Sequence, residues 1–252
     1  MSWSDRVLNY CERGQDPTFW AEPLNAVSNA AFLVAAITAG LALSRLPSDR
    51  PVRRRAERAV LWLLVGLVGA IGIGSFLFHT FATRWALLAD VLPITVFMLV
   101  YLGFALRVML GVGWLTIALI FPVFLLAGWF AGDLTCGPIA GWLDGLVLAR
   151  RPCLNGSLGY APALLALWII GGLAVHRQIE GGRELIAAGG IFLLSAVLRT
   201  LDWDLCQHVK VLGHARGTHT FWHLLNAVTL YLLLLAGLRH VALERPIKSM
   251  GS

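Results

Sequence analysis

Residues 59–80 read AVLWLLVGLVGAIGIGSFLFHT and indicate the class of fold. It contains no Asp, Glu, Lys or Arg, and about 20 apolar residues are what a helix needs to cross a bilayer. The rest of the chain is similar: of 252 residues, 58% are hydrophobic and 13% charged, and the mean hydropathy is +0.74. Soluble domains are about 45–50% apolar and about 25% charged. The composition therefore excludes a soluble enzyme, a disordered segment and a disulfide-knot toxin, and indicates an integral membrane protein.

Seven apolar runs predict an all-α bundle of seven transmembrane helices, forming a single domain over residues 1–252. The expected spans are 24–44, 59–80, 86–106, 113–131, 160–176, 184–200 and 218–238. The weaker apolar stretch 136–149 is interrupted by Gly, Pro and Asp, so we expect a re-entrant or surface piece there. Residues 1–23 are expected to form an extracytoplasmic N-terminal segment and not a signal peptide, because no basic region adjoins the first apolar run.

The basic residues predict the orientation. The loop SRLPSDRPVRRRAER, residues 44–58, is rich in arginine, and cytoplasmic loops carry the excess of Lys and Arg. This places the N-terminus outside and the C-terminus in the cytoplasm. It also accounts for most of the net charge of +6 without nucleic acid, and no protein partner is predicted. Short loops in which Arg outnumbers Lys favour a multi-pass protein of a prokaryotic cytoplasmic membrane.

The four cysteines support this orientation, because all of them fall on the predicted outer side. An even number on the oxidising side indicates two disulfides. Three pairings are open, and so is the alternative of free thiols. We favour Cys136–Cys153, which closes one outer loop, and Cys11–Cys206, which ties the N-terminal segment to the last outer loop.

Ionisable and polar residues gather at the outer ends of three spans, where such residues are costly and usually functional. Ser75 and His79 lie four residues apart, hence on one helix face, as do His219 and His223, and Asp90 lies about one turn into the third span. Three neutral imidazoles and a water are typical of catalytic zinc. A neighbouring carboxylate can take and return a proton, and a hydroxyl can donate to a developing oxyanion. We therefore expect a zinc centre on the extracytoplasmic side.

Each of these patterns has a plainer interpretation when taken singly. Two histidines four residues apart often mark a membrane surface, a helical serine often bonds to its own backbone, and Asp90 could pair with an arginine. His208 and His214, in the last outer loop, are rival ligands, although loop histidines are more often solvated.

The N-terminal segment is rich in oxygen donors, which suit calcium. Its spacing is not that of an EF-hand, and composition alone favours a solvated acidic cap. The donors are Asp5, Asn9, Glu12, Asp16, Glu22 and Asn25.

Taken together, the motifs resemble the alkaline ceramidase family, part of a superfamily of seven-helix membrane hydrolases that includes adiponectin receptors. The shared residues are Ser75-x-x-x-His79, Asp90, His219-x-x-x-His223 and an opening with Cys11-Glu12, Ala21-Glu22, Asn25 and Ser28-Asn29. The resemblance implies zinc held by the three histidines and catalytic roles for Ser75 and Asp90. The implied reaction is hydrolysis of a ceramide-like membrane lipid to a sphingoid base and a fatty acid.

The resemblance also implies a calcium site in the N-terminal segment. Its positions here are Asn9, Tyr10, Glu12, Gly14 and Glu22. The family has Asp and Asn where this chain has Asn9 and Gly14, so the site has lost a carboxylate.

Two other functions stay open. One is a seven-helix lipid receptor or sensor in which zinc is structural, which closed four-ligand coordination would favour. The other is a zinc hydrolase of a different acyl lipid, which only a panel of lipid substrates separates from a ceramidase.

Overall fold

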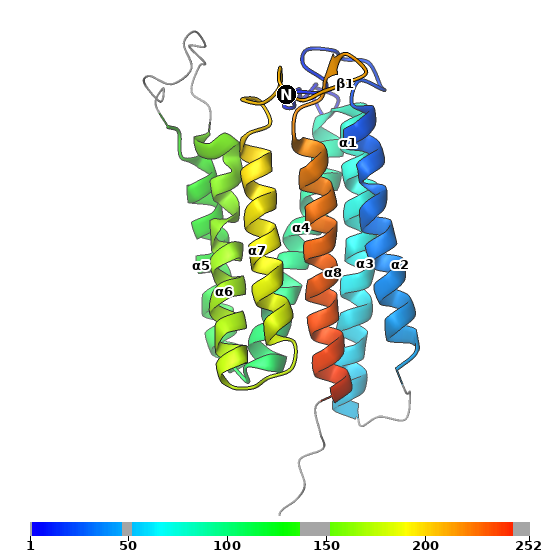
Figure 1. Cartoon of the computed structure of the whole chain (residues 1–252). Helices are drawn as coiled ribbons and strands as arrows, with labels where there is room; N and C mark the ends of the chain where they lie inside the picture. The colour runs from blue at the N-terminus through cyan, green and yellow to red at the C-terminus, as the bar shows by residue number, and fades with distance from the viewer. Residues whose placement is uncertain (1, 47–51, 137–151, 244–252) are drawn as a thin grey trace, which may run out of the picture.

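A computed structural model describes residues 2–46, 52–136 and 152–243. Long helices lie side by side in one bundle, and short segments cover one end (Figure 1). The helices are α1 (Pro23–Ser28), α2 (Ala30–Ser44), α3 (Val52–Phe81), α4 (Arg84–Phe104), the π-helical η1 (Ala105–Met109), α5 (Trp114–Asp133), the 3₁₀-type η2 (Cys153–Tyr160), α6 (Ala161–His176), α7 (Gly182–Thr200) and α8 (His219–Leu243). The strands β1 (Lys210–Val211) and β2 (His214–Ala215) form an antiparallel hairpin before α8.

Each predicted span coincides with a helix of this bundle. Among the described residues, six helical segments are long and apolar enough to cross a membrane, which confirms a multi-pass helical architecture. The exception is α7, whose first and last turns carry charged side chains at Arg183, Glu184 and Arg199. It packs against α6 and α8, but its crossing stays a prediction. Of the weak apolar stretch 136–149, only Cys136 belongs to the described residues, and the remainder lies outside them.

The surface of the bundle is apolar where a soluble protein would be polar. On α5, for example, the apolar side chains of Leu115 and Val123 are 77% and 66% exposed. Such a face is stable against lipid chains and not against water. The outer surface therefore agrees with the composition.

Two of the four glycines in α3 pack closely against neighbouring helices. A Cβ atom at Gly74 would lie 2.0 Å from the carbonyl oxygen of Ala89 in α4, so only glycine permits this contact. Gly72 similarly faces α2, whereas Gly66 and Gly69 face open space. The Gly74 contact matters for function because it brings α3 and α4 together beside the next residues along each helix, Ser75 and Asp90.

The N-terminal segment, residues 2–22, covers the bundle end at which α3 finishes and α8 begins (Figure 1). It runs along the α3–α4 turn, where the Val7 N–H donates to the Ala82 carbonyl at 2.8 Å. A disulfide between Cys11 and Cys206 ties it to the chain after α7, and a second joins Cys136 to Cys153 at η2. These are the two pairs favoured from the sequence.

Candidate metal centre

Three histidines from two helices meet at this covered end. His79 lies in the last turn of α3, and His219 and His223 lie on successive turns at the start of α8. One ring nitrogen from each lies within 4.8 Å of the others, and all three residues are at least 98% buried. The three ring nitrogens thus lie close enough together to bind one metal ion. Neutral imidazole is the form that binds zinc.

The hydrogen bonding of the ring nitrogens fits a cluster that binds a metal ion. Nδ1 of His79 is bonded to Oε2 of Glu22 at 2.5 Å, and Nδ1 of His223 to Oγ of Ser28 at 2.8 Å. Nε2 of His79 and Nδ1 of His219 are buried with no hydrogen-bond partner. Polar atoms that are buried without partners are rare because they are costly. A metal held by the three rings would take one nitrogen from each, and Nε2 of His79 is free for it, since bonds from a second layer to the other nitrogen are usual for metal-binding histidines.

Glu22 is the main residue of that second layer. Its carboxylate also accepts hydrogen bonds from Nε of Arg13 at 2.5 Å and from Nδ2 of Asn25 at 3.1 Å. Burial alone would raise the pKa of Glu22, but His79, Arg13 and Asn25 together hold it below its usual range. Glu22 therefore stays ionised, fixes the imidazole of His79, and makes that imidazole a stronger metal ligand.

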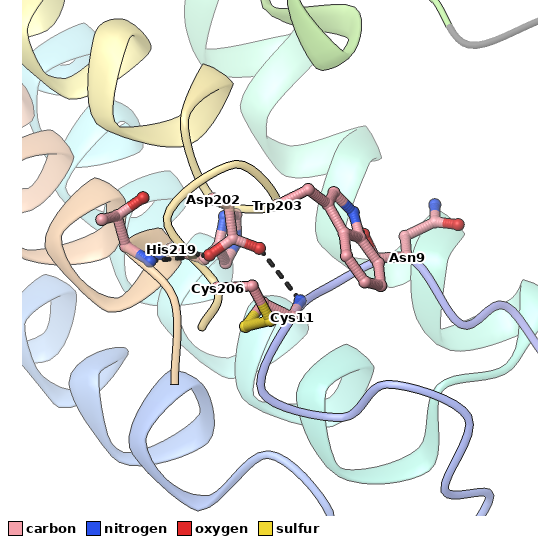
Figure 2. The surroundings of a disulfide bond; sticks show 7 residues. Asn9, Cys11, Asp202, Trp203, Cys206 and His219 are labelled. Atoms are coloured by element: carbon pink, nitrogen blue, oxygen red, sulfur yellow. Dashed lines mark hydrogen bonds between the residues drawn. A yellow bond between two sulfur atoms is a disulfide. The ribbon is translucent and has the colours of Figure 1, made fainter. Parts of the chain in front are cut away.

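Asp202 fixes the start of α8 from a distance in sequence. Its Oδ1 accepts the N–H groups of Thr218 and His219 at 2.8 and 2.9 Å, and its Oδ2 accepts the N–H of Cys11 at 3.0 Å. Figure 2 shows the bonds to His219 and Cys11. Burial raises the pKa of Asp202, and these three donors oppose the rise. Gly217, with φ +64°, permits the contact, because a Cβ there would lie 2.2 Å from Oδ1. The sequence gives no signal for this cap, since Asp202 precedes α8 by a whole loop.

A cavity of about 210 Å³ opens beside the histidines. Its polar end is lined by Ser75, Asp90, Arg199, His219 and His223. The rest of the lining is mostly apolar and includes Phe97, Leu167, Ile170, Leu230 and Leu233. Ser75 and Asp90 thus share one space with two of the three histidines, as the motif predicts.

Arg199 is a cavity residue that sequence analysis missed. Its Nη1 donates to the Asn155 carbonyl at 2.5 Å and to Oγ of Ser157 at 3.1 Å. The guanidinium also lies over the rings of Tyr160 and Trp222, 5.7 and 5.6 Å from their centroids. In the sequence, an arginine at the end of a span is interpreted as a residue that fixes the orientation of the helix in the membrane. The structure shows that Arg199 lines the cavity.

The residues expected to bind calcium are engaged otherwise. The Tyr10 ring stacks on His219 with centroids 3.8 Å apart, and the Tyr10 carbonyl accepts the N–H of Gly14. The Asn9 carbonyl accepts the indole N–H of Trp203 at 2.9 Å. Glu22 supports His79, as described above. Nothing in the described part of the chain supports a calcium ion at these residues.

Glu12 and the two loop histidines are also placed away from any metal centre in the described residues. Glu12 is bonded to Arg216 at 2.7 Å and caps α1 by accepting the N–H groups of Leu24 and Asn25. His208 and His214 are exposed in the segment before α8. The solvated state expected of loop histidines is therefore what the structure shows.

The fold and the site define a multi-pass helical membrane protein with a buried three-histidine cluster facing an apolar cavity. The sequence matches the Ceramidase family model over residues 5–245, nearly its whole length. The chain therefore belongs to the ceramidase family, which confirms the resemblance and implies a hydrolase acting on an amide. No curated protein gives a significant match to the chain.

Proposed function

We propose that this protein is a zinc-dependent intramembrane amidase that hydrolyses ceramide-like lipids to a sphingoid base and a fatty acid. The observation that carries the proposal is the pair of buried, partnerless ring nitrogens on His79 and His219 beside the cavity. His79, His219 and His223 would hold the metal. When bound, zinc polarises a carbonyl and lowers the pKa of a water molecule to about 7.

The remaining roles fall to groups that share the cavity with the histidines. Asp90 takes a proton from the attacking water as the C–O bond forms and returns it to the amine nitrogen as the C–N bond breaks. The hydroxyl of Ser75 donates a hydrogen bond to the oxyanion that develops on the carbonyl. Both side chains line the polar end of the cavity, where the amide would lie.

The cavity volume indicates how such a lipid would bind. Pockets that enclose a whole drug-sized ligand are about 300–1,000 Å³, and this cavity is about 210 Å³. It has room for the amide and the first carbons of the two chains, whose remainder would extend between helices into the bilayer. This requires a site within the membrane-spanning bundle.

The proposed topology has seven crossings, namely the six candidate spans and α7, with the histidines on the outer side. The arginine-rich stretch 44–58 comprises the connection from α2 and the first turns of α3, remote from the histidines, and such stretches are usually cytoplasmic. Both disulfides lie at the histidine end, which suits an oxidising compartment. A prokaryotic cytoplasmic membrane remains our proposal for the location.

The test is metal analysis combined with hydrolysis of a lipid panel by the unmodified protein and His223→Ala. We expect about one zinc per chain, release of fatty acid from ceramides, and loss of both in the variant. Hydrolysis of only another acyl-amide or ester would assign a different lipid to the same chemistry. Zinc binding without hydrolysis of any lipid would favour the receptor or sensor and contradict the proposal.

A further inference from the structure

Arg13 is a buried cation enclosed by oxygen atoms. Its side chain has no exposed surface, although it belongs to the N-terminal segment that covers the end of the bundle. All five of its N–H groups are used, which is the full donor capacity of an arginine. The acceptors are Oε1 of Glu22 at 2.5 Å and the carbonyls of Asp16, Thr18, His79 and Thr80 at 3.1, 2.7, 2.8 and 3.3 Å.

This acceptor set resembles the ligand set of a hard metal ion. Calcium in proteins is bound by carboxylates and backbone carbonyls, which are the two kinds of oxygen around Arg13. The other acidic residue expected to bind calcium, Glu12, is paired with a second arginine, Arg216. A divalent ion placed here would lie next to two guanidinium groups, which repel it at short range.

Arg13 also acts on His79 from two directions. It bonds the backbone carbonyl of His79 at 2.8 Å, and it bonds the Glu22 carboxylate whose second oxygen holds the imidazole. The same side chain therefore fixes the end of α3 and the orientation of the ring. A group that positions the partner of a metal-binding histidine affects metal affinity without touching the metal.

We infer that the Arg13 guanidinium takes the place of a calcium ion in the N-terminal segment and positions His79 for the metal centre, so that this protein needs no calcium. The part of the inference that concerns His79 rests on the proposed zinc site. The part that concerns calcium stands without it.

The first test uses the unmodified protein in lipid nanodiscs. Thermal unfolding is measured after chelation of calcium and with calcium added to about 1 mM, the weak end of protein affinities. We expect the same melting temperature throughout. A saturable upward shift with calcium would overturn the inference, whether or not zinc binds.

The second test measures zinc affinity by competition with a chelator, well below the melting temperature. Arg13→Met should lower the affinity by about 10–100-fold, as loss of second-layer support does, and Arg13→Lys should lie between, because lysine offers three donors in place of five. The control is Arg84→Met, which removes an exposed 3.6 Å ion pair between α4 and Asp5 of the same segment and should change nothing.

The outcomes separate this inference from the proposed function. Unmodified protein that binds no zinc contradicts the proposed function, and the calcium titration still decides the inference. Zinc affinity that is unchanged in Arg13→Met overturns the positioning role. If Arg13→Met does not fold, Arg13→Lys gives the same decision, since unchanged affinity with two donors lost is equally contradictory.

Discussion

The two sides of the bundle differ in how deeply their helices are buried. In the most apolar parts of α3 and α8, 39% and 50% of the residues are buried, against 6% and 17% in the segments containing α5 and α6. All three histidines come from the buried side, as do Glu22 and Ser28, which hold two of them. The exposed side contributes mostly apolar walls of the cavity, such as Leu167 and Ile170, together with Tyr160.

The protein therefore keeps its fixed metal ligands apart from the surfaces that contact lipid. Metal ligands need positions fixed by several hydrogen bonds, which only a packed interior supplies. Lipid chains need volume and apolar contact, which a loosely packed side next to the bilayer supplies. Variants on the two sides should therefore differ in kind as well as in size of effect.

The largest effect is expected from His79→Ala on the buried side. Removing one of three metal ligands should lower zinc affinity by more than the about 100-fold that a lost second-layer partner can cost, and should abolish amide hydrolysis. Zinc content by mass spectrometry and release of labelled fatty acid measure the two effects. His214→Ala, an exposed histidine at the same end, is the control and should retain both. Normal zinc content in His79→Ala would remove the central assignment.

Asp90→Asn should separate chemistry from metal binding. Asparagine keeps the size of the side chain but cannot accept and return a proton, so we expect activity to fall by about 10²–10⁴-fold. Zinc content should stay at the level of the unmodified protein. An activity within a few-fold of normal would mean that another group transfers the proton.

Glu22→Gln should weaken the metal centre without removing a ligand. We expect zinc affinity to fall by about 10–100-fold, because the charge behind His79 is lost. The pKa of Glu22 is held below its usual value, so the stabilisation that it provides is present above about pH 4.3 and is lost as the pH falls through the lower folded value.

Melting temperatures measured against pH test this sign. The gap between the unmodified protein and Glu22→Gln should be constant from neutral pH down to about 5, and should close in more acid solution. A gap that widens on acidification would show that the carboxyl is protonated in the folded protein and would contradict the network around it.

Ala166→Phe, on the exposed side, should have the smallest effect and a different character. Ala166 lines the cavity, so the larger ring should raise KM for long-chain substrates by about 10-fold and leave zinc affinity unchanged. Leu165→Phe is the matched control, because Leu165 precedes Ala166 in α6 and its side chain is 54% exposed. Equal effects of the two substitutions would indicate that the cavity does not hold the lipid chains.

The helices and the histidine pattern could be predicted from sequence because both depend on local regularities. A charge-free run such as residues 59–80 cannot leave its backbone unbonded in lipid, so it must be helical. Residues four apart, such as His219 and His223, share a helix face wherever the helix lies. The family motif then linked Ser75, Asp90 and the histidines.

The roles of the N-terminal carboxylates could not be predicted in the same way. The family resemblance implies a calcium site at Glu12 and Glu22, and the sequence alone does not show which cations lie next to these carboxylates in the fold. In the fold, Arg13 and Arg216 pair with them, and Arg216 comes from the far end of the chain.

The class of protein, the approximate bounds of its helices and the set of histidines can thus be read from the sequence, since each follows from composition or from spacing along one helix. That Glu22 holds His79, that Asp202 caps α8 and that Arg199 faces the cavity becomes visible only in the folded chain. These partners are separated by loops or whole helices. Their meeting depends on how the helices pack and where the N-terminal segment crosses the bundle, which no local pattern encodes.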